Sequence, residues 1–187
     1  MMALEVFSVV WDAPIIPGVS LAGIPLRASA VDLESVLSRY LVDKSSPRYR
    51  FERGPDLCLR GCRLDESGNG GYIFSLFDDH IVSESKKGVP ALSVLVRDGR
   101  VFALKVYDFS FPGDLASEFF YRGLLSERIG LGSPVSDVLA FTSLEFDEAE
   151  EWFYAGHDYS GLEITGWGVP LEDHPNQLIT AICVIEE

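Results

Sequence analysis

Residues 92–107 have the sequence Leu-Ser-Val-Leu-Val-Arg-Asp-Gly-Arg-Val-Phe-Ala-Leu-Lys-Val-Tyr. Two apolar, β-branched runs, Leu92–Val96 and Val101–Tyr107, flank a short polar turn with Asp98-Gly99 at its centre. An Asp-Gly pair favours the positive φ angles of a tight turn between antiparallel strands. We therefore predict a β-hairpin here, and with it an antiparallel sheet.

Similar strand patterns occur on both sides of this hairpin. Asn69-Gly70 separates the runs Leu57–Leu64 and Tyr72–Phe77, which predicts a second hairpin. Leu178–Ile185 is almost entirely apolar, so we expect this strand to lie centrally in the sheet. Four further runs with strand character are Leu4–Trp11, Arg48–Glu52, Glu151–Tyr154 and Leu162–Trp167.

Helix signals are fewer than strand signals. Ser29 and Asp32 form a capping box in front of apolar residues at helical spacing, which predicts a helix over Ala30–Val42. Shorter patterns predict helices over Asp114–Glu127 and Pro134–Thr142. The expected fold class is therefore α+β, mostly antiparallel sheet with a few helices.

The charge of the chain is unevenly distributed. The 187 residues carry a formal net charge of −14. Residues 1–107 contain 13 acids and 13 cations, whereas residues 108–187 contain 16 acids and only Arg122 and Arg128. Nucleic acid and anionic membrane surfaces are poor partners for such a chain, because both need clustered Lys and Arg. A basic protein partner is compatible with this charge.

A weak internal repeat coincides with the charge boundary. Four residues of the first half have similar residues 105 positions later: Ile24, Leu26, Asp32 and Leu33 correspond to Ile129, Leu131, Asp137 and Val138. Two alternatives follow. The chain is one continuous domain, or it consists of two related α+β subdomains, 1–107 charge-balanced and 108–187 acidic.

The sequence has no features of a membrane or secreted protein. No apolar run reaches the length of a membrane helix, and the N-terminus lacks the pattern of a signal peptide. Cys58, Cys62 and Cys183 form an odd set, unlike a disulfide framework. We expect a cytoplasmic protein.

Catalytic and ligand-binding motifs are weak. No glycine-rich phosphate loop, nucleophile elbow or metal-ligand spacing occurs, so we expect no cofactor, no metal site and no enzyme activity. One alternative remains open. Asp78, Asp79 and His80 could belong to the site of a small bacterial enzyme or ligand-binding protein.

The most unusual segment is 145–154, in which five acids lead into three consecutive aromatic residues. It is either a solvated loop before a core strand or a recognition surface, on which acids attract a basic partner and aromatic side chains anchor it. The candidate partner-binding residues are Glu145, Asp147, Glu148, Glu150, Glu151, Trp152, Tyr154, Asp158, Trp167, Glu172 and Asp173. Glu163 could extend the same surface.

Two parts of the chain resemble a known group of proteins. Ile129-Gly130-Leu131-Gly132, followed by Ser133 and by Asp137-Val138-Leu139, is similar to the Ile-x-Leu-Gly segment before a helix in some bacterial immunity proteins. Gly23–Leu26 is a fainter version, with Arg27 where the second copy has Gly132. Gly161–Ile164 and Gln177–Val184 resemble the terminal strands of those proteins.

The resemblance implies a function that agrees with the charge. Such proteins are encoded beside polymorphic toxins of type VI secretion or contact-dependent systems, and they neutralise the cognate toxin in the cytoplasm. The implied activity is stoichiometric binding of a cognate, basic toxin, without catalysis. A structural or regulatory protein that binds another basic partner is the remaining alternative.

Overall fold

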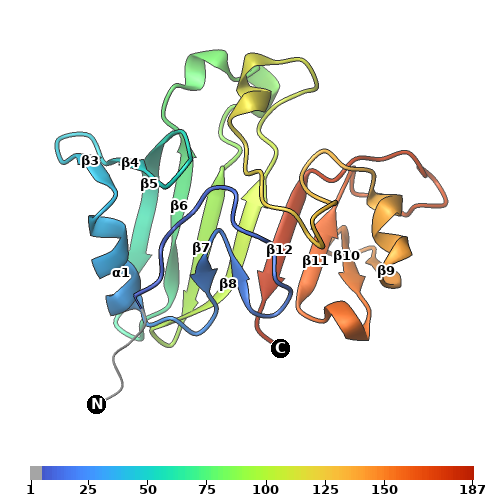
Figure 1. Cartoon of the computed structure of the whole chain (residues 1–187), viewed down its shortest axis with the longest axis horizontal. Coiled ribbons are helices and arrows are strands. Elements are labelled where there is room, and N and C mark those ends of the chain that lie inside the picture. Colours follow the sequence, from blue (N-terminus) through green and yellow to red (C-terminus); the bar gives the residue numbers. More distant parts are fainter. Residues whose placement is uncertain (1–5) are drawn as a thin grey trace.

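A ten-stranded antiparallel sheet forms the centre of the molecule (Figure 1). The computed structural model describes residues 6–187, apart from the side chain of Cys62, and it confirms the α+β class. The order across the sheet is β3-β4-β5-β6-β7-β8-β12-β11-β10-β9. The strands are β3 (Leu41–Asp43), β4 (Arg48–Arg50), β5 (Asp56–Leu64), β6 (Gly70–Leu76), β7 (Leu92–Arg97), β8 (Arg100–Tyr107), β9 (Leu144–Asp147), β10 (Trp152–Ala155), β11 (Leu162–Thr165) and β12 (Ala181–Ile185).

The remaining elements are short. A separate hairpin pairs β1 (Ser20–Leu21) with β2 (Ile24–Pro25), and α1 (Ala30–Ser38) follows it. The 3₁₀ helices are η1 (Asp79–Ile81), η2 (Glu84–Lys86), η3 (Leu115–Glu118), η4 (Val135–Ala140) and η5 (His157–Tyr159).

Both predicted hairpins are confirmed. β7 pairs with β8 around Asp98-Gly99, and both of these residues have positive φ angles. β5 pairs with β6 around the turn that contains Asn69-Gly70. The last strand, β12, lies between β8 and β11, so its predicted central position is also confirmed.

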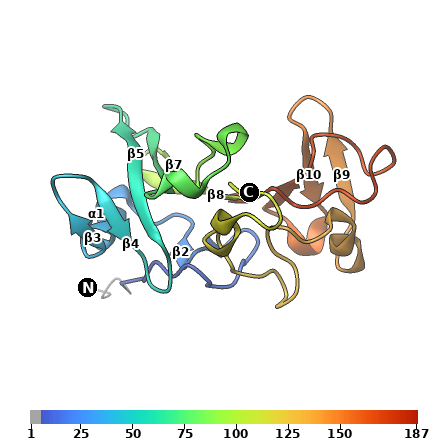
Figure 2. The same ribbon diagram turned by 90° about the horizontal axis from the view of Figure 1, so that it is seen from above.

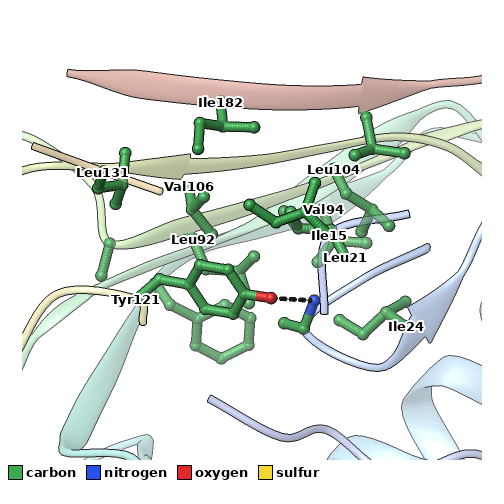
Figure 3. Packing of buried hydrophobic residues seen from close by; sticks show 14 of the residues in the cluster. Ile15, Leu21, Ile24, Leu92, Val94, Leu104, Val106, Tyr121, Leu131 and Ile182 are labelled. Carbon is green, nitrogen blue, oxygen red and sulfur yellow. Dashed lines mark hydrogen bonds between the residues drawn. The ribbon is translucent and has the colours of Figure 1, made fainter. Parts of the chain in front are cut away.

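The hydrophobic core lies on one face of the sheet, the core face. It contains alternate strand residues such as Val94, Leu104 and Ile182 (Figure 3). The N-terminal segment, α1 and residues 115–140 cover this face (Figure 2). The other alternate residues form the outer face, on which Ile73, Tyr154 and other side chains contact solvent.

Tyr121 joins the covering segments to one another. Its side chain is fully buried, and its hydroxyl accepts a hydrogen bond from Ala22 N and donates one to Ala13 O (Figure 3). Its ring also meets Trp11 edge to face, with ring centroids 5.6 Å apart. Burial of this side chain raises the pKa of the Tyr121 hydroxyl, so the group is neutral in the folded protein.

The two halves of the chain repeat one arrangement around α1 and η4. Arg27 N donates to Val101 O at 2.7 Å, and Gly132 N donates to Ile179 O at 2.9 Å. Arg27 and Gly132 both have positive φ angles, 67° and 82°. Two more hydrogen bonds of the first half have a counterpart in the second. Val101 N donates to Ala28 O at 2.9 Å, as Ile179 N does to Ser133 O at 2.8 Å. Ala30 N donates to Gly99 O at 2.8 Å, as Val135 N does to Gln177 O at 3.0 Å.

The strands continue this correspondence. The meanders β5–β8 and β9–β12 follow the same order, and their last strands pair with each other in antiparallel register. Lys105 faces Cys183 at the middle of this pairing, and the neighbouring pairs are arranged symmetrically about it. The halves are thus related by a pseudo-two-fold axis through the Lys105–Cys183 pair. The pairing of β8 with β12 joins the strands before and after residue 107 into one sheet. The division into two subdomains stays a prediction.

Two local predictions in the first half are wrong. Leu4–Trp11 forms no strand in its described part, residues 6–11: Val10 makes only an isolated bridge to Glu52, and Val9 and Trp11 are buried because the segment lies across the core face. Residues 4 and 5 lie outside the described part of the chain. The predicted helix Ala30–Val42 ends at Ser38, because Leu41 pairs with Tyr49 as part of β3.

The predicted helices of the second half are also too long. Asp114–Glu127 contains only the single 3₁₀ turn η3, because Tyr121 turns into the core while Leu115 is 70% exposed. Pro134–Thr142 becomes the 3₁₀ helix η4, and Pro134 precedes its first residue. The capping prediction holds for α1, where Ser29 Oγ accepts a hydrogen bond from Asp32 N at 3.0 Å.

Replacement of Tyr121 tests the buried hydrogen bonds of the covering segments. We expect Tyr121→Phe to lower the free energy of unfolding by about 1–3 kcal/mol, because Ala22 N–H and Ala13 C=O lose a buried partner. Urea unfolding measures this change. Tyr159→Phe, which loses an exposed contact with Ser126, is the control and should cost no more than about 0.5 kcal/mol. Equal effects of the two substitutions would contradict the role of Tyr121.

Candidate interaction surface

The hairpin of β9 and β10 separates its aromatic residues between the two faces of the sheet. Phe153 is buried on the core face, where its ring centroid lies 4.8 Å from that of Phe146. Trp152 and Tyr154 alternate with Phe153 and therefore lie on the outer face, half-buried. Each is opposite an acid of β9, because Trp152 pairs with Asp147 and Tyr154 pairs with Glu145. We call residues 145–154 the acidic hairpin.

The turn of the acidic hairpin is held by Asp147. Its carboxylate Oδ1 accepts hydrogen bonds from Ala149 N at 2.8 Å and Glu150 N at 3.1 Å, and its carbonyl accepts one from Glu151 N at 2.8 Å. Asp147 thus has a structural role in addition to its charge. Glu148, Glu150 and Glu151 are exposed around this turn.

A second exposed aromatic residue is held by the buried amide of Gln177. Gln177 is fully buried, its Oε1 accepts a hydrogen bond from Trp167 N at 2.9 Å, and its Nε2 donates to carbonyl groups between residues 169 and 174. These bonds organise residues 166–176, which we call the Trp167 loop. Trp167 itself remains 55% exposed, with its ring against that of His174 at a centroid distance of 5.7 Å.

The acidic hairpin and the Trp167 loop touch each other. A Cβ atom on Gly168 would lie 2.9 Å from Glu151 Oε2, and Thr165 Oγ1 donates to Glu151 O at 2.7 Å. Glu172 and Asp173, exposed in the same loop, belong to this end of the molecule. Most of the predicted partner-binding residues are therefore brought together, although 22 positions separate Glu151 from Asp173 in the sequence.

Asp158 is separate from the other candidate residues. It lies in η5, which follows the last residue of β10, whereas the acidic turn precedes its first residue. A strand of four residues spans about 13 Å, so Asp158 lies at the opposite end of the hairpin. Its neighbour Tyr159 contacts Ser126 at 2.9 Å instead of any residue of the turn.

The acids of the surface lack intramolecular cation partners. Among residues 6–187, the ion pairs involve acids of the first half and Glu186, and none involves an acid between 108 and 185. Lys105 is close to this surface: its Nζ lies 4.8 Å from the centroid of the Trp152 ring. Burial, followed by the charges of Glu163, Asp147 and Glu150, raises the pKa of Tyr154. The surface thus has a negative field.

Glu163 is part of this surface, which the sequence indicated it could extend. In β11 it pairs with Tyr154 on one side and with Cys183 on the other, and it is half-buried on the outer face. Burial raises the pKa of Glu163, and the charge of Lys105 partly offsets this effect. Cys183 is fully buried, as predicted, and burial raises the pKa of its thiol to about 12.

The first half shows what the fold itself requires at these positions. Apart from β-bulges at Leu59/Gly61 and Leu95/Val96, the strand pairings of β5–β8 follow those of β9–β12, so the outer-face residues of the acidic hairpin have equivalents in the first half. The equivalents of Glu145, Asp147, Trp152 and Tyr154 are Gly61, Arg63, Gly71 and Ile73. The same architecture therefore forms without an acid or an aromatic ring at any of these four positions.

The alternative site is divided between two clefts. Asp78 and His80 line a cleft of about 760 Å³ together with Arg48 and Arg50. Asp79 lines a different cleft, of about 430 Å³, and lies 3.8 Å from Arg60. The three residues thus do not face one common space. In the described part of the chain, no group of three His, Cys, Asp or Glu side chains has an arrangement that could hold a metal ion.

The raised pKa of Glu163 predicts a pH dependence of stability. Because the folded protein holds this proton more tightly than the unfolded chain, the contribution is complete below the ordinary value of 4.5 and is lost as the pH rises through the folded pKa. We expect Glu163→Gln to lack this part of the pH dependence. Urea unfolding between about pH 4 and about pH 8 measures it. Glu148→Gln, on the exposed turn, is the control, and parallel pH curves for Glu163→Gln and the unsubstituted protein would contradict the prediction.

Comparisons with protein-family models, curated proteins and solved structures give no match for this chain. Over the described residues, no helix is both long enough and apolar enough to cross a bilayer.

Proposed function

We propose that this chain is an immunity-type inhibitor that neutralises a basic protein toxin by direct, stoichiometric binding. The acidic hairpin and the Trp167 loop form the contact surface. The acids attract the toxin, and Trp152, Tyr154 and Trp167 supply apolar contact area. The resemblance of residues 129–139 and 177–184 to bacterial immunity proteins supports the same assignment.

The observation that carries this proposal is the difference between equivalent positions of the two halves. Gly61, Arg63 and Gly71 occupy the places of Glu145, Asp147 and Trp152, so the sheet does not need acidic and aromatic side chains there. Carboxylates without partner cations repel one another, which opposes folding. A cationic partner offsets this repulsion when it binds, and the same field accelerates its association.

The primary test is neutralisation. We expect co-expression of this chain to protect cells from the toxin encoded by an adjacent gene, and we expect the two proteins to co-purify in a fixed ratio. Static light scattering of the purified complex gives the stoichiometry. Failure of the chain to protect against, or to co-purify with, any product of its neighbouring genes would contradict the proposed function.

Charge reversal tests the contact surface. We expect Glu148→Lys combined with Glu150→Lys to slow association with the toxin by about tenfold or more at low salt, because the steering field is lost. Stopped-flow measurements over a salt series give the rate and its salt dependence. Asp147 is left unchanged because its carboxylate holds the turn.

The first half provides the matched control for this experiment. Glu66 and Asp98 are exposed in its two hairpin turns, and neither forms an ion pair among the described residues. Glu66→Lys combined with Asp98→Lys changes the net charge by the same amount. If the control pair slows association as much as the Glu148 and Glu150 pair, total charge and not the acidic hairpin determines the rate.

A further inference from the structure

An apolar groove lies beside the Trp167 loop. Its volume is about 570 Å³, and residues of the segments 108–120, 131–133 and 166–180 line it. The apolar side chains that line it are Phe111, Pro112, Phe120, Leu131, Trp167 and Leu178. Phe111 and Trp167 are 44% and 55% exposed, so both walls present an aromatic ring to solvent.

The wall formed by Trp167 is held in a fixed position. Gly166 permits the close approach of Gln177, because a Cβ atom there would lie 2.4 Å from Gln177 Oε1. Gly168, on the other side of Trp167, has a φ of +75°, which a larger residue rarely adopts. An exposed tryptophan whose backbone is fixed by a buried amide loses little conformational entropy on binding.

The charge of the segments that flank the groove indicates which charge its ligand carries. The groove lining itself contains one acid, Asp108, and one cation, Lys86, whereas the segments that flank it, 108–118 and 166–180, contain five acids and neither Lys nor Arg. The one cation that lines the groove, Lys86, is already engaged: its Nζ donates to Asp108 O at 3.3 Å and lies 5.0 Å from the centroid of the Phe111 ring. An apolar ligand group with neighbouring positive charge complements such a groove.

The first half lacks the Trp167 loop at the equivalent place. There the two-residue turn Asp98-Gly99 replaces the Trp167 loop, since Gly99 is the equivalent of Gln177. Arg27 occupies the place of Gly132, and its Nε donates to Glu186 at 2.6 Å. The wall of the groove that Trp167 forms is therefore an addition to the repeated architecture.

We infer that this groove binds a large apolar side chain that the basic partner presents next to Lys or Arg. The inference rests on the proposed function and adds to it a defined anchoring site. The partner's cations contact the acids of the groove walls and of the acidic hairpin, while its apolar side chain lies between Phe111 and Trp167.

The test uses short peptides, so that it does not depend on the toxin. The probe is acetyl-Lys-Phe-Lys-amide, and the comparison peptides are acetyl-Glu-Phe-Glu-amide and acetyl-Lys-Ala-Lys-amide. NMR detection of the tryptophan indole N–H groups reports binding, because Trp11 is buried and Trp167 lines the groove. We expect the Lys-Phe-Lys peptide to shift the Trp167 signal and leave the Trp11 signal unchanged, and both comparison peptides to have little effect.

Substitutions in the protein complete the test. We expect Phe111→Ala to weaken binding of the Lys-Phe-Lys peptide by about tenfold, as for an anchoring contact. Leu139→Ala removes an apolar side chain of similar exposure outside the groove and should change the affinity by less than about twofold. No shift at Trp167, equal shifts with all three peptides, or equal affinities of the two variants would overturn the inference. Neutralisation in the co-expression experiment is measured separately, so a failed peptide titration does not imply failure of the proposed function.

Discussion

The structure depends on the antiparallel pairing of β8 with β12. These strands end the two meanders, and their hydrogen bonds join residues 56–107 and 144–185 into one sheet. The pairing is symmetric about Lys105 and Cys183, and even the bonds at its two ends correspond: Asp108 N donates to Thr180 O, and Glu186 N donates to Phe102 O, both at 2.8 Å. The apolar strands β8 and β12 therefore contribute the centre of the core and fix the position of one half relative to the other.

Comparison of the two symmetry-related halves distinguishes residues that the fold needs from residues that only the surface of the second half carries. Residues that recur in both halves, such as the buried Leu104 and Ile182, pack the core face. Residues that differ lie on the outer face and in the turns, where the second half has acids, aromatic rings and the longer Trp167 loop. Both halves form the same meander, but only the second half carries these acids and aromatic rings, so they are not needed for folding and are available for binding.

Local signals predicted a large part of this fold. Asp98-Gly99 and the Ser29 cap depend on neighbours within a few residues, so the sequence identified them correctly. The strand predicted over Leu4–Trp11 was wrong because the alternating burial of this segment arises from long-range contacts, including the hydrogen bond from Trp11 N to Glu52 O. The helix predicted over Asp114–Glu127 was wrong because Tyr121 is buried in the core, where its hydroxyl forms hydrogen bonds with the distant residues Ala13 and Ala22. The candidate acids, Glu163 among them, were identified from composition. The pairing of Glu163 with Cys183 and the contact of Glu151 with Gly168 depend instead on strand register and loop packing.

The central claim is that a basic protein covers the acidic hairpin and the Trp167 loop. Hydrogen–deuterium exchange of backbone amides, measured on the free chain and on its complex with the co-purifying toxin, tests this claim directly. The proposed binding mode predicts slower exchange in residues 145–154 and 166–176 of the complex, with little change in the equivalent segment 61–73 of the first half. Slower exchange confined to the first half, with the acidic hairpin unaffected, would contradict it.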